Sequence, residues 1–210
     1  MIYEHNLNPV AVEFFSLKIH WYSLAYILGF IFCNYYSKYL IKQKLLNLEL
    51  SIIDDLITWL IVAVLLGGRL GYVIFYNFDF YFSNPLEILK IWQGGMSFHG
   101  ALIGVIVLII FFSRVKKIKF SQLANLVAYS SPIGIFLGRL ANFINGELIG
   151  RPTDGTWGVV YKSELYTRHP SQIYEALFEG LIIFLLLNLF IRSNLKDKFN
   201  GYALFLIFYS

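Results

Sequence analysis

Long runs of apolar residues alternate with short polar segments along almost the whole chain. A helix needs about 20 residues to cross the hydrocarbon core of a bilayer, which is about 30 Å thick. Five apolar runs are long enough and predict membrane-spanning helices, whereas a sixth run begins near Asn200 and reaches only half this length at Ser210. The five complete predicted spans are Ile19–Leu40, Ile52–Phe75, Gly95–Phe112, Ser121–Ala141 and Ile173–Phe190.

The composition supports a membrane protein and argues against a soluble domain with an apolar tail. Hydrophobic residues make up 58% of the chain and charged residues 14%, whereas soluble domains have about 45–50% apolar and about 25% charged residues. The net charge of +4 does not indicate a nucleic-acid partner, because the basic residues are concentrated in a few loops. Cys33 is the single cysteine, which excludes a disulfide framework and a cysteine-rich metal site.

The basic residues also predict the orientation of the chain. They cluster after the first, third and fifth spans, and the positive-inside rule places such loops in the cytoplasm. The N-terminus is therefore expected outside, and the turn-rich segment 142–171 is expected to be an external loop region. We predict an all-α fold in which residues 1–210 form one polytopic helix bundle. The clustered basic residues are Lys38, Lys42, Lys44, Arg114, Lys116, Lys117, Lys119, Arg192, Lys196 and Lys198.

Polar side chains gather at the predicted outer ends of four spans: Tyr22, Arg69, His99 and Arg139. Ionisable groups are costly in lipid, so they should face a cavity or one another. Arginine can hold a phosphate through two parallel hydrogen bonds, and histidine exchanges a proton near neutral pH. This set favours chemistry on a phospholipid headgroup. A transporter, the alternative, needs polar groups across the midplane, where segments such as Val105–Ile110 are apolar.

Pairs of glycines four residues apart lie in three of the predicted spans. This spacing places both glycines on one helix face and is typical of closely packed membrane helices. Packing is the simpler interpretation of these pairs, and it would hold nearby polar side chains in fixed positions. The pairs are Gly67 and Gly71, Gly100 and Gly104, and Gly134 and Gly138.

Five segments of the chain resemble the prolipoprotein diacylglyceryl transferase family. A lone glycine pair would be weak evidence, but these matches occur in family order and one of them is 14 residues long. Together they extend over nearly the whole chain. The segments are HWYSL at 20–24, GGRLGY at 67–72, GGMSFHG at 94–100, GRLANFINGELIGR at 138–151 and RHPSQIYE at 168–175.

The resemblance implies an enzyme of the bacterial inner membrane with seven spans and a periplasmic N-terminus. Such an enzyme moves the diacylglyceryl group of phosphatidylglycerol to the thiol of the lipobox cysteine in a prolipoprotein, the first step of lipoprotein maturation. The resemblance implies no metal or cofactor. The outer-leaflet location that it implies agrees with the topology predicted from the basic residues.

The resemblance also assigns roles to individual residues. The thiol must lose its proton, and the phosphate gains charge as it leaves, which fixed cations stabilise. The family pattern implies His99 as the base or proton relay and Arg139 as the phosphate ligand, with Tyr22 as a further catalytic residue. The implied substrate-binding residues are Arg139, Asn142, Asn145, Glu147, Gly150 and Arg69.

Structural interpretations of these residues stay open. His99 is alternatively a histidine hydrogen-bonded between helices, and Arg69 an arginine that reaches the headgroups from a span end. Asn142 and Asn145 are alternatively capping or turn residues, and Glu147 is equally compatible with shaping the loop.

The chain departs from the family pattern at two places. The external segment between Gly150 and Arg168 is short, and the family pattern continues beyond Gly201 and Tyr202 into a further arginine and a seventh span. If Ser210 ends the natural polypeptide, we expect weak or absent activity. An inactive product of a decayed gene is therefore an alternative to the enzyme.

Overall fold

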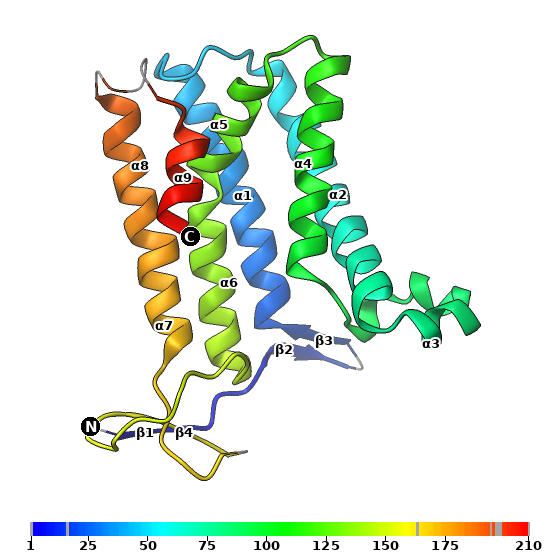
Figure 1. The fold of residues 1–210 in the computed structure, drawn as a ribbon, viewed down its shortest axis with the longest axis vertical. Coiled ribbons are helices and arrows are strands. Elements are labelled where there is room, and N and C mark those ends of the chain that lie inside the picture. Colours follow the sequence, from blue (N-terminus) through cyan, green and yellow to red (C-terminus); the bar gives the residue numbers. More distant parts are fainter. Residues whose placement is uncertain (1, 16, 163, 194, 196–198, 210) are drawn as a thin grey trace. The chain divides into compact units, whose positions relative to one another are not determined.

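The computed structural model describes residues 2–15, 17–162, 164–193, 195 and 199–209 (Figure 1). Helices predominate, as expected. Three helical stretches in the described residues are long and apolar enough to cross a membrane. They agree within three residues with the second, third and fifth predicted spans and run over Ser51–Tyr76, Phe98–Val115 and Ser171–Arg192. The total number of spans and their orientation stay predictions.

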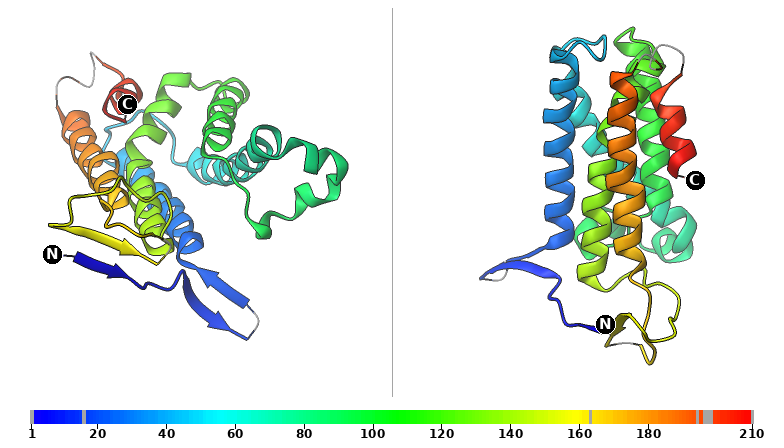
Figure 2. Two further views of the ribbon diagram at one scale, coloured as in Figure 1. Left: turned by 60° about the horizontal axis from the view of Figure 1, so that its bottom comes forward. Right: turned by 90° about the vertical axis from the view of Figure 1, so that its left-hand side faces the viewer.

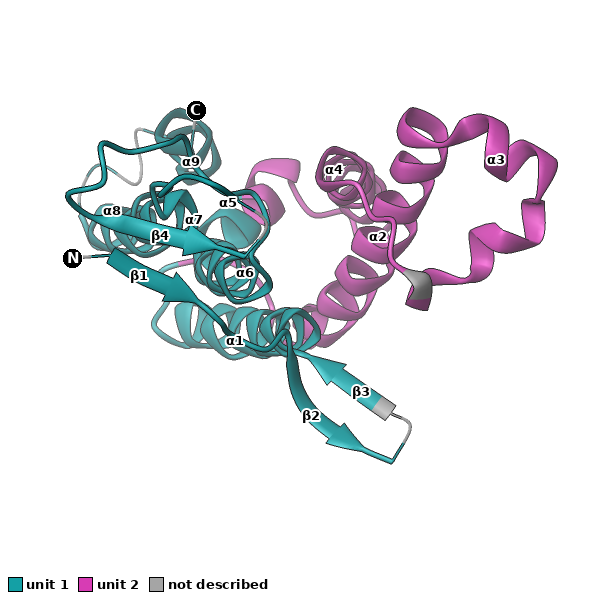
Figure 3. Ribbon diagram, turned by 90° about the horizontal axis from the view of Figure 1, so that it is seen from below, with its two compact units in different colours: residues 1–45, 125–210 teal, residues 46–124 magenta. Residues whose placement is uncertain are grey.

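The chain divides into two compact units, residues 1–45 with 125–210 and residues 46–124 (Figure 3). In the first unit, α6 packs against α1 and against the helical stretch that begins with α7 (Figures 1 and 2). Leu40, Leu126, Ile183, Leu187 and Ile191 are buried there. The helices are α1 (Trp21–Lys42), α6 (Pro132–Asn145), α7 (Ser171–Glu175), the π-helical η3 (Ala176–Ile182), α8 (Ile183–Arg192) and α9 (Gly201–Tyr209).

The mostly helical structure is consistent with the predicted all-α membrane fold, and the first unit also has four short strands. β1 (Ile2–His5) pairs in parallel with β4 (Gly158–Tyr161), and β2 (Val10–Phe14) forms an antiparallel hairpin with β3 (Leu17–His20). The partners β1 and β4 are more than 150 residues apart. Such pairing depends on the tertiary fold rather than on local sequence, and a two-stranded pair is marginal on its own.

The fourth predicted span is interrupted. In place of one helix over Ser121–Ala141, the chain forms α5 (Phe120–Ser130) and α6, which begins at Pro132. Proline has no N–H group and clashes with the preceding helical turn, so it breaks a helix.

The end of α6 also differs from the prediction. The helix continues to Asn145, and Gly146 follows it with a φ of 69°. This left-handed conformation suits glycine and ends helices. Asn142 and Asn145 therefore lie on the last turn of α6 rather than in the external loop.

The second unit is built on two closely packed helices, α2 (Ser51–Tyr76) and α4 (Phe98–Val115). A Cβ atom added to Gly67 would lie 2.5 Å from the carbonyl oxygen of Gly100, and one added to Gly104 would lie 2.5 Å from that of Ala63. The glycine packing predicted for these two helices is confirmed. Between them the chain forms α3 (Phe78–Ser83) and two short 3-10 turns, Pro85–Leu89 and Ile91–Gln93.

The third predicted glycine pair gives a mixed result. In the first unit, a Cβ atom on Gly29 of α1 would lie 3.2 Å from the Cα atom of Gly134, so these two helices approach closely there. A Cβ atom on Gly138 would have no neighbour within 4 Å among the described residues. Gly138 is therefore not a packing glycine in this sense.

Candidate functional site

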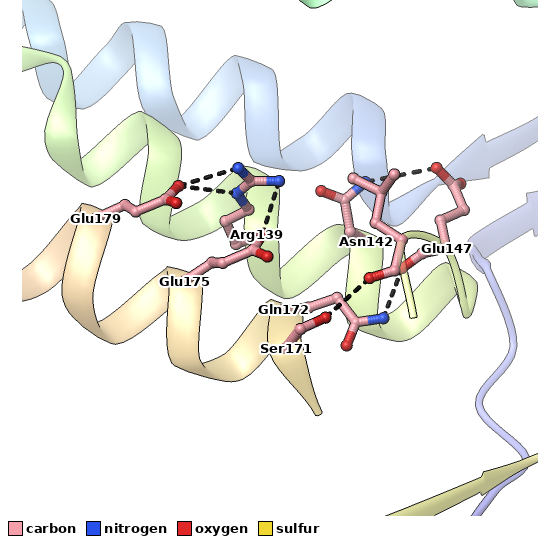
Figure 4. A network of polar contacts seen from close by, with 8 residues as sticks. Arg139, Asn142, Glu147, Ser171, Gln172, Glu175 and Glu179 are labelled. Atoms are coloured by element: carbon pink, nitrogen blue, oxygen red, sulfur yellow. Dashed lines mark hydrogen bonds and ion pairs between the residues drawn. The ribbon is translucent and has the colours of Figure 1, made fainter. Parts of the chain in front are cut away.

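Arg139 lies on α6 between two glutamates of the neighbouring helical stretch (Figure 4). Its Nε and Nη2 atoms donate to Oε2 of Glu179, at 3.3 Å and 3.0 Å, and its Nη1 atom is 2.9 Å from Oε2 of Glu175. All three side chains are partly buried. Sequence reasoning missed both glutamates as partners of Arg139. Two carboxylates in an apolar stretch were the available signal, because ionisable groups in such a position need a partner.

Close packing of η3 on α6 places Glu179 beside Arg139. Gly180 faces the backbone of Phe136, where a Cβ atom would lie 2.7 Å from the Cα atom of Phe136. Any larger residue would therefore hold the two helices apart. Short π-helical segments within α-helices occur frequently at functional sites.

A second polar cluster lies where α6 ends (Figure 4). Asn145 donates from Nδ2 to Glu147 at 2.7 Å, and the buried Asn142 donates to the same carboxylate at 3.4 Å. The backbone carbonyl of Glu147 accepts a hydrogen bond of 2.5 Å from the fully buried Gln172. Three predicted substrate-binding residues thus form one network, and Gln172 links it to α7.

Tyr161 of β4 completes this network. Its hydroxyl donates to Oε1 of Gln172 at 3.3 Å. Burial raises the pKa of Tyr161 above its usual value, while the hydrogen bond to Gln172 acts in the opposite direction. The phenol therefore stays protonated as a donor, so both polar ends of Gln172 are used. The segment that follows α6 is in this way tied to the end of that helix.

Gly150 has a packing role that its sequence position alone did not reveal. A Cβ atom there would collide with the carbonyl oxygen of His169. Beside this contact, the His169 N–H donates to the Arg151 carbonyl at 2.9 Å. Gly150 thus allows the two sides of the external loop to approach each other directly.

Tyr22 lies in the first turn of α1, where its ring packs 5.2 Å from that of Tyr26. It is partly exposed and belongs to the same compact unit as Arg139.

His99 is exposed in the first turn of α4, in the second unit. The preceding Ser97 caps this helix by accepting a hydrogen bond of 3.2 Å from the Gly100 N–H. The Phe98 ring contacts the imidazole edge-to-face at 5.7 Å. Among the residues that the structure describes, His99 has no hydrogen-bond partner. This differs from the alternative of a histidine bonded between helices.

Arg69 is also in the second unit, but the residue is only 3% exposed and its guanidinium is already bonded to backbone. It donates to five carbonyl groups between Glu87 and Gly95. A guanidinium has five N–H donors, so each is matched by a carbonyl. This geometry favours a structural role for Arg69 over the expected contact with a lipid phosphate.

Asn142, Asn145 and Glu147 thus form one network in the first unit. Tyr22, Arg139 and Gly150 belong to the same unit. Arg69 and His99 belong to the second unit. The meeting of His99 with Arg139 stays a prediction.

Comparison with known proteins is consistent with the sequence motifs. Residues 9–210 match the family model described as prolipoprotein diacylglyceryl transferase. A relative from Ehrlichia ruminantium is 43% identical over 97% of this chain and 80% of its own length. One from Rickettsia bellii is 44% identical over 98% and 79%, and one from Mesorhizobium japonicum is 44% identical over 92% and 70%. All three are named phosphatidylglycerol–prolipoprotein diacylglyceryl transferase. On these matches, the chain belongs to the prolipoprotein diacylglyceryl transferase family.

Proposed function

We propose that this chain transfers the diacylglyceryl group of phosphatidylglycerol to the thiol of the lipobox cysteine of a prolipoprotein. The observation that carries the proposal is the arrangement around Arg139. A partly buried guanidinium, held by two carboxylates, lies on the same helix as the amide side chains that surround Glu147. Both groups lie within the segment 138–151 that carries the strongest family resemblance.

The transfer reaction needs a base for the thiol proton and a cation for the leaving phosphate. The cysteine thiol gives its proton to a base, and the sulfur forms a bond to the terminal glycerol carbon of the lipid. The bond between that carbon and the phosphate oxygen breaks, and its electron pair leaves with glycerol phosphate. Fixed cations stabilise charge that develops on a leaving group. We assign this stabilisation to Arg139 and the proton transfer to His99, whose exposed imidazole suits general-base catalysis.

The amide and loop residues are assigned to substrate binding. Asn142 and Asn145 each keep an amide oxygen that is not used in the bonds to Glu147, and amides can donate or accept. Tyr22 on the adjacent α1 keeps its assignment as a further catalytic residue. Gly150 acts through the close approach of the loop strands, and Arg69 through the backbone that it holds.

The proposed setting is the bacterial inner membrane, with the N-terminus and residues 146–171 outside. The basic loops after α1, α4 and α8 support this orientation through the positive-inside rule. The polar groups of α6 and the first turn of α4 then lie in the outer leaflet, where a secreted prolipoprotein presents its cysteine.

The test is an assay of diacylglyceryl transfer from phosphatidylglycerol to a lipobox peptide in vesicles. Because the relatives are longer than this chain, the assay uses the chain itself and the chain extended by the C-terminal segment of the Ehrlichia relative. We expect His99→Gln and Arg139→Ala to abolish transfer, since each removes a group assigned to the reaction.

Matched controls keep this test specific. His20 is exposed at the end of β3 and Arg114 is exposed near the end of α4, so His20→Gln and Arg114→Ala should retain transfer. Near-normal rates in both the His99 and the Arg139 variants would remove these residues from the mechanism. Absence of transfer in every form, including the extended chain, would favour the inactive-product alternative.

A further inference from the structure

The segment between α2 and α4, residues 77–95, exposes an unusual amount of apolar surface. We call this segment the lip. Phe82, Leu86 and Trp92 are each more than three-quarters exposed, and Phe78 and Leu89 are more than half exposed. Figure 3 shows α3 and the turns after it lying away from α2 and α4 in their unit. Apolar surface of this extent is rare on proteins in water and marks an interaction site.

The position of the lip in the chain indicates that its partner is the lipid of the membrane. It joins the end of α2 to the start of α4, and both helices are long and apolar enough to span a membrane. They are packed side by side, so a segment that connects them lies at one membrane surface. The exposed apolar side chains continue onto the last turn of α2 at Phe75 and Tyr76. The surface of the lip is thus continuous with that of a predicted spanning helix.

Lipid contact raises a difficulty that Arg69 resolves. The lip is built from one short α-helix and two 3-10 turns. The carbonyl groups at the ends of such short helices lack partners within the helix, and carbonyl groups without partners are costly in a membrane. Arg69 donates to the carbonyls of Glu87 at 2.7 Å, Ile88 at 2.9 Å and Lys90 at 3.4 Å. It also donates to those of Gly94 at 2.6 Å and Gly95 at 3.1 Å. One buried side chain therefore binds carbonyl groups from Glu87 to Gly95, including those near the ends of the two 3-10 turns.

The contacts on the inner side of the lip support the same interpretation. Tyr81 is the buried aromatic of α3, and its ring lies 5.0 Å from the Arg69 guanidinium carbon and 6.4 Å from the Tyr72 ring. In the described residues Arg69 has no carboxylate partner. The charge of Arg69 is therefore balanced by carbonyl dipoles and an aromatic face.

We propose that the apolar side chains of the lip lie in the headgroup–acyl boundary of the membrane. We also propose that Arg69, through its bonds to the carbonyl groups, holds the backbone of the lip in the conformation that exposes these side chains. Interfacial segments with Trp, Phe and Leu on one face bury that face about 5–10 Å into this boundary. The proposal rests on membrane insertion and not on the transfer reaction, so it can fail or hold independently of the proposed function.

The test uses Trp92 as the only tryptophan, excited selectively over the tyrosines. Trp21, Trp59 and Trp157 are replaced by Phe, and the full chain is reconstituted in vesicles of phosphatidylcholine and phosphatidylglycerol. Some of the lipids carry bromine at shallow or deep acyl positions. We expect Trp92 to be quenched most by shallow bromine and little by aqueous iodide. The control keeps Trp157 alone, on the external loop, which iodide should quench more than brominated lipid does.

Contact of the lip with water, a peptide or a second copy of the chain would give different results. Strong iodide quenching of Trp92 without bromine quenching would overturn the proposal. Protection that appears only when a lipobox peptide is added would identify a peptide surface instead. Protection that increases with the protein-to-lipid ratio would indicate a second copy of the chain.

The role of Arg69 has its own test in the same background. Arg69→Met keeps an unbranched apolar stem but has no donors, so the lip should leave the boundary. Trp92 is then expected to lose bromine quenching and to shift its emission to the red. Arg69→Lys retains part of the donation and should be intermediate. An unchanged depth of Trp92 in a folded Arg69→Met variant, judged by far-UV circular dichroism, would refute this role.

Discussion

At the scale of single residues, the main feature is that one arginine, Arg139, lies beside two carboxylates. Arg139 carries one positive charge and faces Glu175 and Glu179. Charge-assisted hydrogen bonds of this kind fix the orientation of a guanidinium. A lipid phosphate that approaches the same guanidinium competes with the carboxylates. The glutamates therefore both position Arg139 and limit its affinity for an anion.

The Glu179→Gln variant tests this competition. The amide keeps the shape of the side chain but removes its charge, so we expect the KM for phosphatidylglycerol to fall. A hydrogen bond to a charged group is worth about 1.5–3 kcal/mol, which corresponds to about tenfold or more in KM. Steady-state kinetics in vesicles measure the change. Glu164→Gln is the control, because Glu164 pairs with Arg168 in the external loop. A higher KM in the Glu179→Gln variant would show that positioning outweighs competition.

At the scale of elements, glycines decide how closely the helices approach. Gly67 of α2 lies against the backbone of Gly100 in α4, whereas Gly138 of α6 has open space where its Cβ atom would be. The three residues have the same spacing pattern in sequence. Their different surroundings depend on which helix faces them.

The pair Gly67→Ala and Gly138→Ala tests this difference. We expect Gly67→Ala to destabilise the protein by about 1–3 kcal/mol, the usual cost of overpacking. Gly138→Ala should be neutral or stabilise by about 0.5–1 kcal/mol, because alanine favours the helix. The free energy of unfolding in mixed detergent micelles measures both. Equal destabilisation by the two substitutions would contradict the assignment.

At the scale of the whole molecule, the basic loops predict the direction of the chain through the membrane. The positive-inside rule places the N-terminus outside and the loop after α4 in the cytoplasm. Cys33 is the single cysteine and is buried, with its thiol donating to the Ser130 hydroxyl at 3.0 Å. A single substitution of Cys33 therefore removes the only native thiol that could react in a labelling experiment.

Cysteine labelling tests the orientation. In a Cys33→Ser background, Asn6→Cys should react with a membrane-impermeant maleimide added to intact spheroplasts. Lys117→Cys, in the turn after α4, should react only after the cells are opened. Both positions are exposed, so access depends on the side of the membrane. Labelling of both variants from outside would contradict the predicted topology.

The sequence by itself determined the helical, apolar character of the chain, the presence of glycine pairs suited to close helix packing, and the family. Length and apolar content are local properties, and the motifs are read directly. Only the tertiary structure decided the pairing of β1 with β4, the two glutamates at Arg139 and the carbonyl partners of Arg69. These contacts join residues from 18 to more than 150 positions apart. The partner of a side chain depends on which segments the fold places beside it, and no local pattern specifies that.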